Sequence, residues 1–543
     1  MSAGVAALAA WTHGLRGEWF GLTVTVHDPV RPLALAGVLL AARWFIVRHR
    51  ESPSTVLAVA VPRVIAGALL VAGVLAWAHY LSPFLGGADS YGYVSAAGRI
   101  RSGVLVQREA VADLIPHPAS AIPLGYVPKA GTSGVSVPAY ALGLPALMAL
   151  AASLFGERAP FFVPFVSAVV LLAVCFWLVR RWTRDPTVAL FAAAAVTVHP
   201  VVFAYAIQPM SDVPATMWFL VAGALLLDAR TLVAALGGGA AGVAVLTRTA
   251  LLPACAALIL LPLATGPKRA IRAAAFATAL AGAVAVQLGL QWHLYGSPLG
   301  NGYGSPGDLF GLRFLPANVR SYAHWGFLTQ GPIWIAGVLV GFVSCRERTA
   351  RATVVAAAIG AVLPYAVYRT YDDWETQRFI LPLLVVGTMF AVIGLMSAAR
   401  RLLGDRAGAW AAMFLIIAMA WSWAQWLERQ QVLSLARRQE RFAQAGRLVE
   451  RVTPADAVVL ASLHSGSLRY YAHRLTIDWG KIPPGQFDAT RAALQGAARP
   501  VFLMLDGEEE RVQFVSRHGS VIDDQHWLPS GERDLFLFQA PVR

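Results

Sequence analysis

Two acidic residues stand where apolar stretches of the chain end, and their placement is typical of a reaction site at a membrane surface. Residues 86–93 read GGADSYGY and carry Asp89, and residues 208–214 read QPMSDVP and carry Asp212. A carboxylate in such a position can act as a general base toward a hydroxyl group or as a metal ligand. Either residue can instead cap the helix that follows it, and the two roles are compatible.

The segment around and after Asp89 offers further groups that could bind a substrate. Lys129 could pair with a phosphate as a point charge, and His117 lies in a constrained Pro-His-Pro turn. For both residues, an ordinary solvated loop side chain is the alternative. The segment also holds the acids Glu109 and Asp113 and the aromatic residues Tyr91 and Tyr93.

Two arginines and two tyrosines complete the set of candidates. Arg378 begins the apolar part of a segment, at residues 371–382, that reads YDDWETQRFILP. There it could bind a phosphate with two hydrogen bonds or simply reach the membrane surface. Arg248 lies inside an apolar stretch, where a charge is costly, which favours a functional role. Tyr295 and Tyr303 stand in Gly-rich and Pro-rich turns that suit a binding surface or a structural loop.

Composition shows what kind of elements must position these groups. Hydrophobic residues make up 57% of the chain and charged residues 14%. Soluble proteins average about 45–50% hydrophobic and about 25% charged residues. Apolar runs recur that are long enough to cross about 30 Å of hydrocarbon. These features exclude a large soluble globule and a disordered chain. They predict a polytopic α-helical membrane protein with about 11–13 transmembrane helices.

The distribution of charge predicts the orientation in the membrane. The net charge is +14, and the 116 residues from Glu428 to Arg543 contribute only +1 of it. The remaining excess forms short basic clusters between apolar runs, which is the pattern of cytoplasmic loops and not of a nucleic-acid-binding surface. With these clusters inside an inner (plasma) membrane, Asp89, Asp212 and the C-terminal part face the periplasm or the outside.

The same pattern divides the chain into three parts. Residues 1–62 are an N-terminal extension with one probable extra transmembrane helix, without the basic start of a cleaved signal peptide. Residues 63–427 are the membrane module, with a long first outer loop at 83–135. Residues 428–543 have a soluble composition. Helix-like runs at 429–451 and 486–498 and strand-like runs at 457–463, 500–505 and 533–539 predict a small α/β domain. The three cysteines lie in or beside apolar runs, so we expect no disulfide and no cysteine metal site.

One segment conflicts with this alternation. Residues 136–155 are apolar enough to cross the membrane, but they contain Pro138 and Pro145, which disfavour a regular helix. We expect a tilted or re-entrant segment that is buried against protein. The alternative is a true crossing, which would put the basic cluster at 180–184 on the outside.

The order of the motifs resembles the GT-C superfamily of membrane glycosyltransferases, the group related to protein O-mannosyltransferases and lipid A aminoarabinose transferases. The resemblance covers roughly residues 63–398. It rests on Asp89, on the Pro-rich apolar stretch that ends at Phe155 and Gly156, and on the segments 209–214, 242–248, 295–298 and 378–382.

The resemblance implies an enzyme in contact with membrane lipids that takes a sugar from a polyprenyl-phosphate carrier on the outer side of the membrane and inverts the configuration at the anomeric carbon. Asp89 would be the catalytic base and Asp212 a second carboxylate of the site. Arg378 and Lys129 would hold the carrier phosphate, with Arg248 as a third candidate. Many members have two adjacent acidic residues at the first motif, whereas Ser90 follows Asp89 here, so a divalent cation is an open possibility.

Two other functions fit some of these features. A transporter or flippase of lipid-linked saccharides would bind the same cargo with the same aromatic and arginine groups. Such proteins usually show repeated halves and charged groups near the middle of the membrane, whereas this sequence has no visible repeat and gathers its acids on one side. A polymerase or ligase of envelope glycans would differ only in its acceptor, which can be a lipid, a glycan or a protein.

Overall fold

The computed structural model describes residues 53–264 and 266–519, with side chains from residue 61 onward except that of Pro306, and the backbone of four further strands. Two of these strands, β1 (Leu15–Trp19) and β2 (Leu22–Val26), pair antiparallel near the N-terminus. The extra transmembrane helix expected within residues 1–62 lies outside the described residues.

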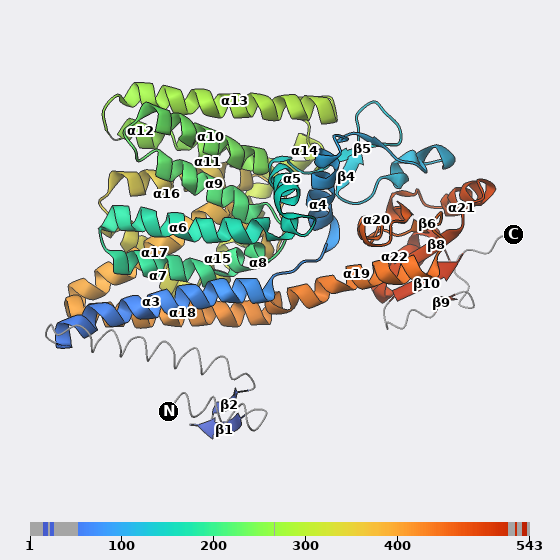
Figure 1. The fold of residues 1–543 in the computed structure, drawn as a ribbon. Coiled ribbons are helices and arrows are strands. Elements are labelled where there is room, and N and C mark those ends of the chain that lie inside the picture. Colours follow the sequence, from blue (N-terminus) through green and yellow to red (C-terminus); the bar gives the residue numbers. More distant parts are fainter. Residues whose placement is uncertain are drawn as a thin grey trace.

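A bundle of helices forms the larger part of the molecule, and most of its long helices run side by side (Figure 1). The segment that contains α17 is the most deeply buried of the candidate membrane spans. Glycines bring α15 and α17 into close contact, because a Cβ atom at Gly341 would lie 2.1 Å from the carbonyl oxygen of Phe390. The bundle comprises α3 (Pro53–Tyr80), α6 (Val163–Thr183), α7 (Pro186–Val198), α8 (Pro200–Ala206), α9 (Asp212–Leu225), α10 (Thr231–Thr247), α11 (Leu252–Ala257), α12 (Leu260–Ala264), α13 (Arg269–Tyr295), α15 (Leu315–Ser344), α16 (Arg348–Tyr365), α17 (Leu381–Leu403) and α18 (Asp405–Arg429).

The polytopic helical class is confirmed, with fewer long spans than the 11–13 expected. Within the described residues, six helices are long and apolar enough to cross a membrane, and α7 with α8 makes a seventh candidate that bends by 64°. The difference arises because other apolar stretches fold as shorter helices, such as the 14 residues of α9. A helix of that length spans about 21 Å, less than the hydrocarbon core.

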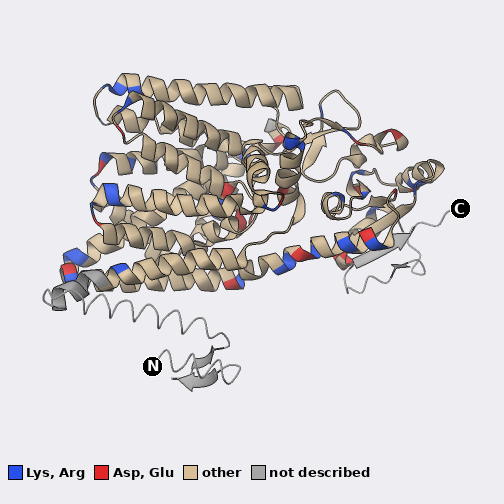
Figure 2. Cartoon of the chain, in the orientation of Figure 1, with Lys and Arg blue, Asp and Glu red and all other residues tan. Residues whose placement is uncertain are grey.

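Basic residues gather at the ends of the long helices that lie away from the C-terminal sheet (Figure 2). Arg180 and Arg181 close α6, Arg400 and Arg401 close α17, and Lys268 precedes α13. The clusters that the sequence places in the cytoplasm therefore share one end of the bundle, although the side of the membrane stays a prediction.

At the other end of the bundle, the first outer loop and the apolar segment that follows it fold into α4 (Gly87–Arg101), a small sheet and α5 (Gly143–Phe155). The helices α4 and α5 lie across the direction of the long helices (Figure 1). With 13 residues, α5 is about 20 Å long, so the apolar segment 136–155 does not make a full span. The small sheet consists of β3 (Gln107–Arg108), β5 (Val135–Pro138) and β4 (Tyr126–Pro128), in that order and antiparallel.

The predicted C-terminal α/β fold is confirmed. Its sheet has the order β7-β6-β8-β10-β9, in which β6 pairs parallel with β7 and β8, and β10 pairs antiparallel with β8. Sequence patterns indicated β6, β8, β10 and two of the helices but missed the short strand β7. The elements are α19 (Leu435–Val452), β6 (Val458–Leu460), α20 (Ser467–Tyr471), β7 (Leu475–Ile477), α21 (Phe487–Gly496), β8 (Val501–Asp506), α22 (Gly507–His518), β9 (Trp527–Leu528) and β10 (Leu535–Gln539).

The C-terminal sheet and the first outer loop share one hydrophobic core. Val111, Ile115 and Ala121 of the loop are buried in the same cluster as Ile477 and Trp479 of the C-terminal part. Because burial of apolar surface stabilises both parts at once, the C-terminal sheet is fixed to the loop that carries α4.

Candidate active site

Four segments that are distant in sequence meet where α4 crosses the end of the bundle. Asp89 lies in the first turn of α4, and Asp212 is the first residue of α9. Arg248 follows the last residue of α10 in an extended conformation. Arg378 lies in the last turn of a 3₁₀ helix, η6 (Trp374–Ile380), which leads directly into α17. The four charged residues singled out in the sequence form two ion pairs.

Asp89 and Arg378 form the accessible pair. Nη1 of Arg378 donates a hydrogen bond of 3.3 Å to Oδ2 of Asp89, and the two side chains are 25% and 34% exposed. The residue at the N-cap of α4 is Gly86, and no side chain caps the helix. The alternative in which Asp89 serves as a helix cap is therefore wrong, since the carboxylate faces a guanidinium and not the free amides of α4.

Asp212 and Arg248 form a buried pair. Nη1 of Arg248 contacts Oδ1 of Asp212, and only 1% of the Asp212 side chain is exposed. Nε of Arg248 also donates to the hydroxyl of Tyr365 at 3.4 Å. The capping alternative is wrong here too, because Ser211 is the N-cap of α9 and no side chain caps it. Because the Asp212 carboxylate is buried, it cannot reach an acceptor, but it can fix the orientation of Arg248.

A tyrosine of α4 connects the two pairs. The hydroxyl groups of Tyr93 and Ser211 lie 3.0 Å apart, which ties α4 to the turn before Asp212. Burial, followed by the charge of Asp89, raises the pKa of Tyr93. The phenol is therefore neutral at physiological pH and can donate a hydrogen bond.

Tyr140 is a site residue that the sequence analysis missed. Its ring lies 4.9 Å from that of Tyr93 and 5.8 Å from that of Tyr303, which is 56% exposed. Burial raises the pKa of Tyr140, and the neighbouring Asp89 carboxylate adds to this effect. A Cβ atom at position 92 would lie 2.4 Å from the Tyr140 ring. Gly92, inside the GGADSYGY motif, was the signal that another group approaches α4 closely.

The side chain of Arg378 lies among aromatic and acidic side chains, and the sequence indicated only some of these neighbours. The centre of its guanidinium lies 5.5 Å from the ring of Tyr205 and 5.4 Å from the ring of Phe379. The Tyr205 hydroxyl in turn donates to Glu375 at 3.4 Å. Tyr205 could not be found from sequence because it lies in the unremarkable apolar helix α8.

Four of the predicted binding residues are not joined to the accessible pair. Within the described chain, the side chains of His117, Lys129, Tyr91 and Tyr295 make no hydrogen bond or ion pair with Asp89 or Arg378. The hydroxyl of Tyr295 instead donates to the carbonyl oxygen of Pro138 at 2.8 Å. Tyr91 is buried against Tyr126 and Gly466, on the side of α4 that faces the C-terminal sheet.

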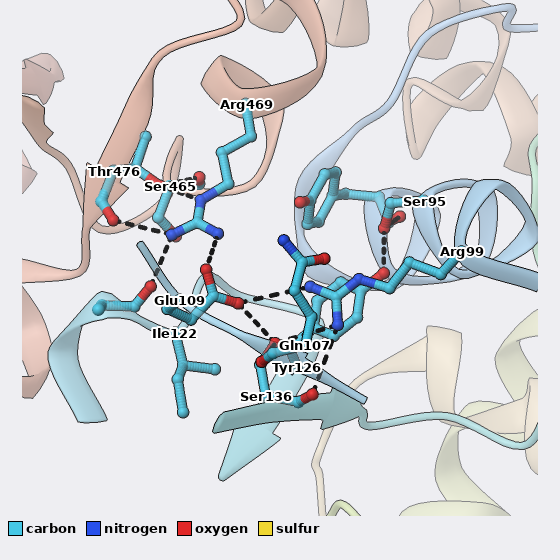
Figure 3. A network of polar contacts seen from close by, with 12 residues as sticks. Ser95, Arg99, Gln107, Glu109, Ile122, Tyr126, Ser136, Ser465, Arg469 and Thr476 are labelled. Carbon is cyan, nitrogen blue, oxygen red and sulfur yellow. Dashed lines mark hydrogen bonds and ion pairs between the residues drawn. The ribbon is translucent and has the colours of Figure 1, made fainter. Parts of the chain in front are cut away.

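Glu109 holds that side of α4 to the C-terminal sheet (Figure 3). Its carboxylate is 2% exposed and pairs with Arg99 of α4 at 3.4 Å and with Arg469 of α20. It also accepts a hydrogen bond of 2.5 Å from Ser136. Arg469 donates as well to the carbonyl oxygen of Ala121 at 2.6 Å. The sequence offered Glu109 as a spare acid, and the structure makes it a bridge between the outer loop and the C-terminal part.

The carboxylates do not assemble a cation site. In the described part of the chain, no three His, Cys, Asp or Glu side chains are grouped so that they could hold a metal ion. Asp89 and Asp212 are each occupied by an arginine. Within the described residues, each of these two carboxylates therefore has an arginine as its partner and not a second acidic side chain.

Comparison with known proteins identifies the fold. No protein-family model and no curated protein matches the chain. Among solved structures, ArnT from Cupriavidus metallidurans bound to undecaprenyl phosphate is similar, with a TM-score of 0.52 and 12% identity over 87% of this chain and 97% of ArnT. The fold is GT-C-like. The apo form of ArnT gives a TM-score of 0.51 with the same identity and coverage.

The GT-C-like fold confirms the architecture that the resemblance implied. A further match, archaeal oligosaccharyltransferase AglB from Archaeoglobus fulgidus in complex with an inhibitory peptide and a dolichol-phosphate, has a TM-score of 0.47 and 13% identity over 83% of this chain and 71% of AglB. At 12% identity the likeness to ArnT establishes the fold, and the activity has to be argued from the residues of this chain.

Proposed function

We propose that the protein is a glycosyltransferase of the GT-C type, which moves a sugar from a polyprenyl-phosphate donor to a hydroxyl group of a cell-envelope acceptor. The observation that carries the proposal is the solvent-accessible pair of Asp89 and Arg378. It sets a candidate base beside a candidate phosphate-binding group. The ArnT structure of the same fold contains undecaprenyl phosphate, a donor carrier of the kind that this pair would serve.

In the proposed reaction, the Asp89 carboxylate takes the proton of the acceptor hydroxyl as its oxygen attacks the anomeric carbon. The bond between that carbon and the phosphate oxygen breaks, and the phosphate leaves with the electron pair. Because the attack comes from the side opposite the phosphate, the configuration at the anomeric carbon is inverted. Arg378 stabilises the charge on the leaving phosphate, and its five N–H groups allow it to contact Asp89 and the phosphate together.

The buried pair supports this arrangement. Asp212 fixes the position of Arg248 near the site, and its burial means that it does not offer a second accessible carboxylate. Tyr93, Tyr140 and Tyr303 form a continuous aromatic row beside Asp89, and Tyr303, the exposed member of the row, suits the apolar face of a sugar ring. Arg248 and Lys129 as phosphate contacts, and Tyr91, His117 and Tyr295 as substrate contacts, stay predictions.

The topology belongs to the same proposal. We place α4, α5 and the C-terminal sheet on the periplasmic or outer side, since the basic clusters occupy the other end of the bundle. Residues 63–427 would form the catalytic membrane module and residues 428–543 the soluble domain. The rival activity, flipping of a lipid-linked saccharide, would favour charged groups near the middle of the membrane, whereas Asp89 lies in α4 at the end of the bundle.

A donor panel tests the proposal. Purified protein in lipid nanodiscs is incubated with labelled polyprenyl-phosphate sugars and envelope extracts, and release of the polyprenyl phosphate is followed. We expect one class of donor to be cleaved with transfer of its label, and Arg378→Ala to reduce cleavage. The same protein in closed lipid vesicles tests the rival: movement of labelled donors across the bilayer without cleavage of any of them would identify a flippase.

A further inference from the structure

The helix α15 is broken in the middle, which separates two halves with different tasks. Gly331 has a φ of 78°, a left-handed conformation that favours glycine, and Pro332 begins the second half. The first half ends at Gln330, and its carbonyl oxygen accepts a hydrogen bond of 3.3 Å from the indole of Trp423. The first half can therefore take its own direction relative to α17.

One face of this first half carries a row of polar side chains. Asn318, Ser321, Trp325 and Thr329 recur at intervals of three or four residues, so they lie above one another on the helix. Asn318 donates to the carbonyl oxygens of Ala366 and Tyr368 at 3.1 and 2.6 Å. Ser321 and Trp325 both donate to the carboxylate of Asp372, at 3.0 and 2.8 Å. The polar row thereby binds the segment between α16 and η6.

At its end, the row contacts Gln377 of η6, which is fully buried. Its side-chain amide donates to the carbonyl oxygen of Trp325 at 2.9 Å and to the hydroxyl of Thr329 at 2.7 Å. Its oxygen accepts from the amide of Gln330 at 3.0 Å. Three hydrogen bonds in an apolar environment fix the orientation of this amide strongly, because a misplaced buried amide would lose its partners.

Gln377 directly precedes Arg378 on η6. In a 3₁₀ helix each residue turns by about 120° from the last, so fixing the side chain of Gln377 fixes the direction in which Arg378 leaves the helix. Arg378 is held less firmly by its own contacts, because its side chain is 25% exposed and its bond to Asp89 is 3.3 Å long.

We propose that the polar row of α15 (Asn318, Ser321, Trp325 and Thr329), acting through Gln377, positions Arg378 for the donor phosphate. These are positioning residues, since none of them contacts the Asp89–Arg378 pair. The inference rests on the proposed function of Arg378. It adds that the membrane helix α15, and not the outer loop, sets the place of the phosphate-binding group.

The chain offers a closely matched control. Thr388 of α17 accepts a hydrogen bond of 3.1 Å from the indole of Trp334, in the second half of α15. Thr388 and Thr329 are both buried and both connect α15 to the α17 segment. Thr329→Val and Thr388→Val therefore remove the same hydroxyl group from the same pair of segments, on either side of the break at Gly331.

The test measures kcat/KM for the labelled donor and binding of unlabelled polyprenyl phosphate. We expect Thr329→Val and Gln377→Met to lower both by about tenfold or more, since displacement of a binding group by about 1 Å can cost up to a hundredfold. Thr388→Val should stay within about twofold of the unmodified protein. Thr329→Val keeps the test valid if Gln377→Met does not fold.

A double-substitution cycle separates positioning from general stability. In an Arg378→Ala background, Gln377→Met should have almost no further effect, because the residue it positions is gone. Full additivity, or equal losses in Thr329→Val and Thr388→Val, would overturn the inference. If Arg378→Ala itself leaves donor binding unchanged, the proposed function of Arg378 fails first, which is a distinguishable result.

Discussion

Asp89 and Arg378 are 289 positions apart in the chain and form an ion pair of 3.3 Å that solvent can reach. Asp212 and Arg248, close by in the same site, form a pair that solvent hardly reaches. The difference in exposure assigns different tasks to two pairs of identical chemistry. The open pair can exchange its partners for substrates, whereas the closed pair can only hold its arginine in place.

Arg378→Ala should weaken use of the donor by roughly ten- to hundredfold, since a hydrogen bond to a charged group is worth about 1.5–3 kcal/mol. Arg378→Lys should recover only part of the loss because the planar fork is missing. Steady-state donor kinetics provide the measurement. Arg108→Ala is the control, because Arg108 forms an exposed pair with Asp113 outside the site. Equal kinetics for Arg378→Ala and the control would remove Arg378 from the site.

Asp212→Asn should destabilise the protein more than Asp89→Asn does. Removing one partner of a buried ion pair typically costs about 3–5 kcal/mol, because the other charge stays buried alone. Thermal unfolding of the purified variants measures the difference. The double variant Asp212→Asn with Arg248→Met should regain part of the stability, because it no longer buries an unpaired charge. Unchanged unfolding of Asp212→Asn would contradict a structural role for this pair.

Glu109→Gln should loosen the C-terminal sheet from the first outer loop. The substitution leaves Arg99 and Arg469 without their shared carboxylate, while the hydrophobic core between the two parts remains. Limited proteolysis should release the C-terminal part faster, and transfer should decline because Arg99 lies on the helix that carries Asp89. Asp113→Asn, which breaks only an exposed pair, is the control. Equal proteolysis of the two variants would show that Glu109 is not the bridge.

Topology has its own test. A reporter that is active only in the cytoplasm should be silent when it is fused after Arg543 and active when it is fused after Arg184, which ends α6 at the basic end of the bundle. The expectation follows from the positive-inside rule. Activity of the Arg543 fusion would reverse the orientation and place the Asp89–Arg378 pair in the cytoplasm.

Features that depend on local sequence were predictable. Apolar runs indicated the membrane helices, and alternating patterns indicated β6, β8 and α21 in the C-terminal part. The acids and arginines were found because a charge beside an apolar run needs a physical reason. Within the described residues, fewer helices are long enough to cross a membrane than expected, because apolar composition does not reveal where a stretch bends, as between α7 and α8.

Features that depend on contacts between distant segments were not predictable. Tyr140 and Tyr205 are ordinary aromatic residues until α4 and η6 bring Asp89 and Arg378 beside them. Gln377 was passed over because a buried amide gains its meaning from its partners on α15. The capping role offered for Asp89 and Asp212 was a sound local inference, and tertiary ion pairs replaced it.

The most direct test of the account is transfer of a labelled sugar by Asp89→Asn. Displacement of a phosphate-linked sugar by a hydroxyl group requires removal of a proton, and a general base typically contributes about 10²–10⁴ in rate. Asparagine keeps the shape of aspartate but cannot take the proton. We predict that Asp89→Asn retains expression and thermal stability while transfer falls by at least about a hundredfold. Near-normal transfer by a folded Asp89→Asn protein would contradict the assignment of Asp89 as the base.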